Sequence, residues 1–138
     1  MGTMIRAEIS EKNKHWIDKH RHYELKHFCL QYPIWMREYV ALDIAAKNSS
    51  FERVGVSSDV SDPTAELAMK LSYYDVRISL VERAAKETDE VLYPYILKAV
   101  TEGLSYTYLR NKLHIPCSKD TYYSRYRKFF WILNRLRG

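Results

Sequence analysis

The chain of 138 residues contains few of the residues that a β-rich, disulfide-bonded or membrane-spanning protein needs. Only 4 glycines and 4 prolines are available for turns, too few for an all-β fold. The 2 cysteines, Cys29 and Cys117, are too few for a disulfide framework and have no metal-binding spacing. No apolar run approaches the ~20 residues of a transmembrane helix, and the first residues lack the apolar stretch of a secretion signal. We therefore expect a cytoplasmic protein with no membrane segment.

What the chain does have is an uneven distribution of charge. The net charge is +5, but residues 105–138 contain 8 basic residues and a single acid, Asp120, whereas residues 48–104 contain 6 basic and 10 acidic residues. Positive charge concentrated in one segment is typical of proteins that contact nucleic-acid phosphates. A solvated helix face would have the same composition, so charge alone leaves both interpretations open.

The apolar pattern predicts an all-α fold that begins with an N-terminal helical region over residues 1–62. Within it, residues 5–47 have helical periodicity. Pro33 disfavours helical geometry at Tyr32 and suits the first turn of a new helix, so two helices or one kinked helix are expected. The serine-rich residues 48–62 have no helical period and are expected to form a linker.

A central helix is predicted over residues 63–89. Asp62 can cap its first N–H groups, and Pro63 fits the first helical position. Apolar residues then recur at steps of four and three, the spacing of a coiled-coil seam, at Leu67, Leu71, Tyr74, Ile78, Val81 and Ala85. Such a seam either packs against the N-terminal helices of the same chain or forms a homodimer. The periodicity does not separate the two.

Residues 90–138 are predicted to form a helix-turn-helix DNA-binding domain. A short helix from Glu90 ends near Gly103, and a second one spans residues 106–113. Pro116 stops that helix, and Ser118 can cap a last helix that runs to about residue 137. The expected core face of the last helix consists of Tyr122, Tyr126, Phe129, Leu133 and Leu136.

The polar residues of this last helix come early, where a recognition helix enters the major groove. The side chains expected to reach base edges are Lys119, Thr121, Tyr123 and Ser124. Those expected to meet phosphates further along are Arg125, Arg127 and Lys128.

Three stretches carry a family resemblance: SDPTAELAMKL at Ser61–Leu71, IPCSKDTYYSRYRKFF at Ile115–Phe130, and the closing WILNRLR. With them, the chain from Ser61 onward resembles the phage and prophage late-gene transcriptional activators of the RinA/ArpU group. In that group a terminal helix-turn-helix is similar to the fourth region of sigma factors. The first predicted helix, which is dense in histidine and lysine, departs from the family pattern, so no role is transferred to it.

The resemblance implies a sequence-specific activator of phage late operons in the cytoplasm of a bacterial host. Its partners would be double-stranded DNA and, as a candidate, RNA polymerase. By position, the resemblance assigns DNA contacts to Ser118, Lys119, Thr121, Tyr123, Ser124, Arg125, Arg127 and Lys128.

Two other functions fit the same features. A small-terminase-like DNA-recognition subunit also combines a helix-turn-helix with an oligomerising helix. A basic helical protein could instead bind RNA or an acidic protein partner.

The sequence offers no constellation for catalysis, a cofactor or a metal ion. The phosphate-binding and hydrolase motifs GxGxxG, GxSxG and HExxH are all missing. Four histidines fall between His15 and His27, but their spacings of 5, 2 and 5 do not stack two ligands on one helix face. We therefore expect neither an enzyme nor a metalloprotein.

Overall fold

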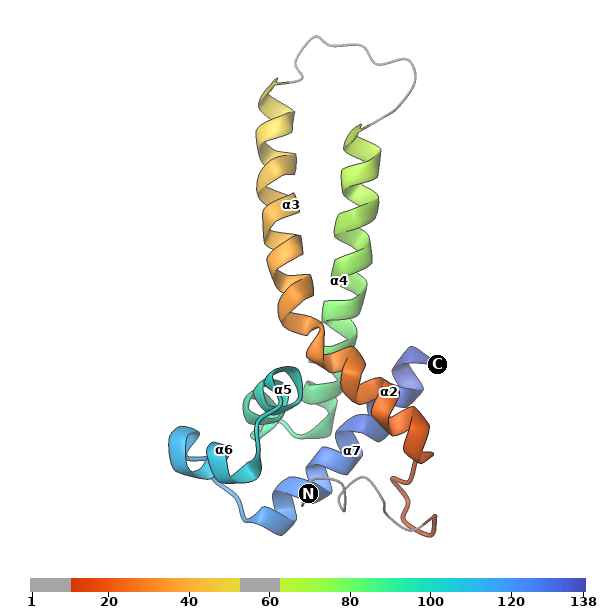
Figure 1. The fold of residues 1–138 in the computed structure, drawn as a ribbon, viewed down its shortest axis with the longest axis vertical. Coiled ribbons are helices and arrows are strands. Elements are labelled where there is room, and N and C mark those ends of the chain that lie inside the picture. Colours follow the sequence, from red (N-terminus) through yellow and green to blue (C-terminus); the bar gives the residue numbers. More distant parts are fainter. Residues whose placement is uncertain (1–10, 53–62) are drawn as a thin grey trace. The chain divides into compact units, whose positions relative to one another are not determined.

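A computed structural model of the protein describes residues 11–52 and 63–138 (Figure 1). Every regular element in these residues is a helix, which confirms the all-α expectation. The helices are α2 (Lys19–Leu30), α3 (Tyr32–Glu52), α4 (Pro63–Thr88), α5 (Tyr93–Glu102), α6 (Tyr106–Leu113) and α7 (Lys119–Arg137). Residues 5–10 of the first predicted helix, the predicted cap Asp62 and the linker from residue 53 lie outside the described residues.

The chain divides into two compact units. The first, here called the terminal unit, combines Met1–Gln31 with Leu80–Gly138 and so contains α2, the last part of α4, and α5 to α7. The second, the hairpin unit, is Tyr32–Ser79 and contains α3 and the first part of α4. The expected divisions after residues 62 and 89 therefore do not coincide with these units.

The expected break at Pro33 is present, because α2 ends at Leu30 and α3 begins at Tyr32. The helical prediction was wrong for residues 11–18, which form turns over residues 11–15 and irregular backbone over residues 16–18. Asn13 Oδ1 accepts a hydrogen bond from the His15 N–H (2.8 Å), and Asp18 Oδ1 accepts one from the His20 N–H (2.9 Å). Such local bonds from Asn and Asp side chains compete with helix formation, so the helix starts only after Asp18.

The linker was predicted to begin at residue 48, but helix α3 continues to Glu52. Serine and asparagine are only moderately unfavourable within a helix. The first strong helix breaker after Lys47 in the sequence is Gly55. Polar composition alone therefore placed this boundary too early.

The central helix is confirmed as α4, and its seam is progressively buried along the chain. Ile78 is 7% exposed, and Val81 and Ala85 are fully buried. The earlier members Leu67 and Leu71 are half-buried. The C-terminal half of the seam thus packs within its own chain and is not exposed for a homodimer contact.

In the terminal unit, α2 packs against both α5 and α7. Arg21 Nε donates a hydrogen bond to Asn134 Oδ1 at 2.6 Å, and Glu24 accepts from both Arg21 and Arg137. These bonds join the two ends of the chain. They fix α7 against a helix more than 100 residues earlier in the sequence.

The helix predicted from Glu90 begins later, at Tyr93. Asp89 Oδ1 accepts hydrogen bonds from the N–H groups of Val91 and Leu92, both at 2.8 Å, which holds residues 89–92 in a turn. Val91 is consequently 70% exposed instead of facing the core. Gly103 ends α5 in a left-handed conformation (φ 70°), as its position in the sequence predicts.

His22 makes the stability of the terminal unit sensitive to acid. Its ring is 4% exposed and lies 4.7 Å from the ring of Phe130 and 6.0 Å from that of Tyr126. Burial, together with the charge of Lys26, lowers the pKa of His22 from 6.5 to about 4. Because the unfolded chain binds the proton first, stability should be complete above pH 6.5 and fall by up to ~3 kcal/mol toward pH 4.

Urea titrations across this pH range test that expectation. His22→Gln should flatten the pH dependence, whereas His20→Gln, which removes an exposed imidazole from the same helix, should leave it in place. Equal slopes for the two variants would contradict the assignment to His22.

Candidate nucleic-acid interface

The connection between α6 and α7 is a tight, well-bonded turn, as the helix-turn-helix pattern requires. His114 ends α6 with a positive φ of 56°, and the Ile115 N–H donates to the Leu109 carbonyl at 3.1 Å. The buried Tyr106 donates its hydroxyl hydrogen to the Cys117 carbonyl at 2.6 Å. These bonds fix the direction in which α7 leaves the turn.

The start of α7 is capped as the sequence predicts. Ser118 Oγ accepts from the Thr121 N–H at 3.2 Å, and the two side-chain oxygens lie 3.1 Å apart in a further hydrogen bond. Ser118 and Thr121, both among the expected DNA contacts, are therefore hydrogen-bonded to each other. These two bonds hold the first turn of α7.

The buried face of α7 only partly matches the predicted stripe, since Tyr126 and Leu136 are half-buried. Tyr122, Phe129 and Leu133 are buried as expected. Phe130 and Ile132 are buried in addition, because α7 packs on both α2 and α5 and not on one neighbour. The side opposite this core is left for contacts outside the helix bundle.

That opposite side borders an open, polar hollow, here called the basic hollow. It is lined by Asn13, Lys14, His15, Thr88, Asp89, Ser124, Arg125, Arg127 and Lys128. Four of the expected DNA contacts, from Ser124 onward, thus lie together. The turn that precedes α2 brings Lys14 and His15 to the same place.

The pKa of His15 shows that the basic hollow has a positive electrostatic potential. The His15 ring lies 5.2 Å from the ring of Trp131 on α7. Burial lowers the pKa of His15, and the positive charges of Lys14, Lys128, Arg127 and Arg125 lower it further, in that order. Four cations therefore act on one point, and an anion placed there would be attracted by all of them.

Arg125 differs from the other cations because it is already paired. Its Nε donates to Asp89 Oδ2 at 3.0 Å, and the Arg125 side chain is 37% exposed. Burial by itself would raise the pKa of Asp89, but the N–H groups of Leu92 and Val91 and the Arg125 guanidinium lower it overall. Arg125 thus positions the start of α5 against α7, and Arg127 and Lys128 are the better candidates for phosphate contacts.

The two remaining expected contacts lie elsewhere. Tyr123 lines a pocket on another side of α7, with its ring centroid 5.0 Å from that of Tyr122. Lys119, which is exposed, borders a shallow groove between α6 and α7. The same groove contains Arg110 and Asn111 of α6. The structure therefore does not bring all eight expected residues to one surface.

Sequence reasoning missed Lys14, His15 and Arg110. Arg110 belongs to the basic segment but lies on α6, whereas the expected contacts lie on the last helix and at its cap. Nothing in the local sequence places Lys14 and His15 beside α7, because more than 100 residues separate them from Arg127.

A scan against protein-family models found no match to this chain, and searches of curated proteins and of solved structures found none either. Among residues 11–52 and 63–138, no group of three or more His, Cys, Asp or Glu side chains could hold a metal ion. No described helix has the length and apolar character needed to cross a membrane.

Proposed function

We propose that this protein is a sequence-specific DNA-binding regulator of transcription, and that α7 is its recognition helix. The observation that carries the proposal is the basic hollow. Lys14, Arg127 and Lys128 converge there on the outer side of a helix that follows a short, tightly bonded turn. A helix-turn-helix needs this combination of a fixed second helix and cations flanking its exposed side.

The arrangement also separates two kinds of contact along α7. Lys119 and Asp120 are exposed on the first turn, where a recognition helix meets base edges. Arg127 and Lys128 lie about two turns later and beside Lys14, where a helix leaving the groove meets phosphates. The resemblance to late-gene activators supports a role in transcription over a general role in DNA compaction.

The proposal predicts enrichment of one sequence motif when the protein selects duplexes from a random pool. If RNA or an acidic protein is the true partner, no duplex motif should emerge, and the proposal is wrong. A small-terminase-like role would instead return a motif found at a packaging site and not upstream of late genes.

With the enriched duplex in hand, Lys119→Ala and Arg127→Ala should behave differently. Lys119→Ala should weaken binding to that duplex by about 1–3 kcal/mol with little change on random DNA, because a base contact is lost. Arg127→Ala should weaken both complexes about equally and reduce the salt slope by about one.

Fluorescence anisotropy on both duplexes at two salt concentrations measures these effects. Asp120→Asn, which removes the only acid of residues 105–138, is the control for a change of charge on the same turn as Lys119. It should not abolish affinity for random DNA. If Lys119→Ala and Arg127→Ala cannot be distinguished on either duplex, α7 does not read sequence.

A further inference from the structure

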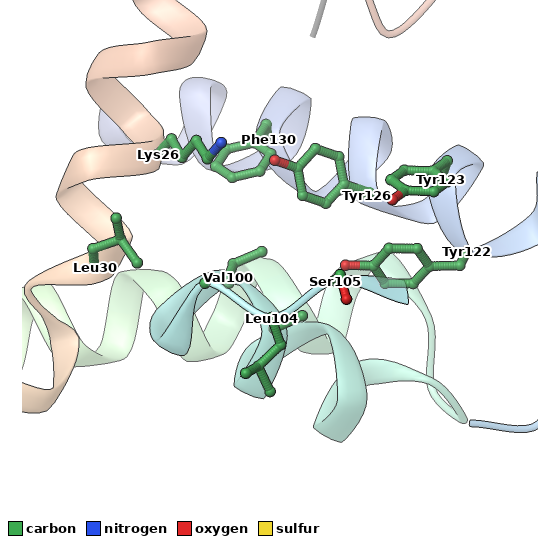
Figure 2. A pocket seen from close by; sticks show the side chains of 11 residues that line it. Lys26, Leu30, Val100, Leu104, Ser105, Tyr122, Tyr123, Tyr126 and Phe130 are labelled. Atoms are coloured by element: carbon green, nitrogen blue, oxygen red, sulfur yellow. The ribbon is translucent and has the colours of Figure 1, made fainter. Parts of the chain in front are cut away.

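The two units of the chain differ in how well they cover their apolar side chains. In the terminal unit, Val100 and Phe130 are buried and line a pocket of only about 110 Å³ between α2, α5 and α7 (Figure 2). In the hairpin unit, Trp35 and Ile78 are the only buried residues among those that the structure describes. Because helices in water are stabilised mainly by burial of an apolar face, a hairpin with so small a core gains stability from a further partner surface.

The exposed apolar side chains of α4 form a stripe of their own. Met69 is 72% exposed, Tyr73 51% and Val76 52%, and they follow one another at steps of four and three. At 3.6 residues per turn, these positions lie nearly opposite the seam that begins with Leu67 and Leu71. An apolar stripe of this spacing on the solvent side of a helix is typical of a surface that another helix covers.

Met69 and Tyr73 also line an open groove between α3 and α4, which run in opposite directions (Figure 1). Leu42 of α3 adds a half-buried apolar side chain to the lining. The Tyr73 ring is held in place, because the Arg77 guanidinium carbon lies 3.4 Å from its centroid and the Tyr74 ring packs edge-on at 5.2 Å. An exposed aromatic side chain that is already fixed loses little entropy when a partner covers it, which is a property of interface anchors.

The charges of this groove indicate which partner fits it. Glu38 lines it from α3 and Lys70 from α4; both are exposed, and neither forms an ion pair with a described residue. A partner surface with charges of one sign would meet one attraction and one repulsion here. A second copy related by a two-fold axis brings its own Lys70 to Glu38 and its own Glu38 to Lys70, since such an axis makes each contact twice.

We propose that two copies of this chain associate through their hairpin units. The groove and the stripe of Met69, Tyr73 and Val76 on one copy pack against the same surface of the other. Four helices, two from each copy, then share one core, as in a four-helix bundle. Glu38 of each copy pairs with Lys70 of the other at the edge of this core. The association uses the side of α4 away from the seam, and it requires neither DNA nor the basic hollow.

Sedimentation velocity of the full chain without DNA tests the association. We expect a monomer–dimer equilibrium with a dissociation constant on the order of 1 µM. Met69→Glu places an unpaired charge in the interface and should weaken the dimer by at least about a hundredfold. Because Met69 is 72% exposed in a single copy, this change does not disturb the core. The matched control is Val40→Glu, which alters a 52% exposed side chain of α3 outside the groove and should leave the dimer intact.

Mixing two charge-reversal variants tests the pairing between copies. Glu38→Lys and Lys70→Glu should each weaken the dimer by at least about tenfold, because like charges then meet at both contacts of the two-fold interface. An equimolar mixture should regain the dimer, since opposite charges then face each other only between the two different copies. Asp43→Lys and Lys47→Glu make the same changes of charge on α3 outside the groove. They should dimerise equally well alone and mixed.

Three results would each overturn the inference. They are a chain that stays monomeric up to about 1 mM, equal weakening by Met69→Glu and Val40→Glu, and a mixture that is no more dimeric than its two components. In each case the groove is covered by a different protein or by none. Because none of these measurements contains DNA, failure of the proposed function in the duplex selection would leave their outcome unchanged.

Discussion

Replacing Arg127 and Lys128 together by alanine is expected to lower the affinity for any DNA duplex by roughly ten- to a hundredfold at 50 mM salt. Both side chains line the basic hollow, and both act on His15 together with Lys14. Each phosphate contact releases condensed counterions, so losing two contacts should reduce the slope of log affinity against log salt by about 2.

The matched control is Arg83→Ala with Lys98→Ala. This pair removes the same charge from the terminal unit, but each residue is engaged with a glutamate of its own helix, Glu87 and Glu102 respectively. If DNA affinity depends only on the net charge of the protein and not on where the charges lie, the two double variants should lose affinity equally. Loss of affinity confined to the first pair assigns the effect to the basic hollow.

Helices α6 and α7 and the turn between them were predictable from the sequence because their signals are local. Gly103, Pro116 and Ser118 each act through their own backbone or that of residues three positions away, and all three occupy the predicted places. The same holds for the break before α3. These local preferences depend on neither partner helices nor long-range contacts, so they set the helix ends however the helices pack.

The composition of the basic hollow could not be predicted in the same way. The ion pair between Arg125 and Asp89 joins residues 36 positions apart, and it engages the Nε of an expected phosphate contact within the chain. The approach of Lys14 and His15 to α7 depends on the docking of α2. Periodicity identifies which face of a helix is polar but not which distant segment comes to lie beside it.

The position of Val91 shows the same limit on a smaller scale. Its apolar side chain fits a helical period. The carboxylate of Asp89, however, accepts hydrogen bonds from the N–H groups of Val91 and Leu92, and α5 begins only after them, at Tyr93. Hydrogen bonds from an aspartate side chain to nearby backbone N–H groups compete with helix formation. The apolar pattern therefore extended the predicted helix by three residues.

Phe129→Ala is expected to destabilise the protein by about 3–5 kcal/mol. Phe129 is 0% exposed, and its ring lies 4.9 Å from that of Phe130 in an edge-to-face arrangement on the core side of α7. Removal of the ring leaves a cavity that the helices around it cannot close. Because proteins of this kind are stable by only about 5–15 kcal/mol, a loss of that size should be evident in urea denaturation and should weaken DNA binding through α7.

Val91→Ala is the contrasting variant. It deletes an apolar side chain that is 70% exposed, so the free energy of unfolding should change by less than about 0.5 kcal/mol. Phe129→Leu should lie between the two, since it retains part of the buried volume. Equal stability of Phe129→Ala and Val91→Ala would mean that α7 is not held by this face, and the assignment of its opposite side to DNA would lose its structural basis.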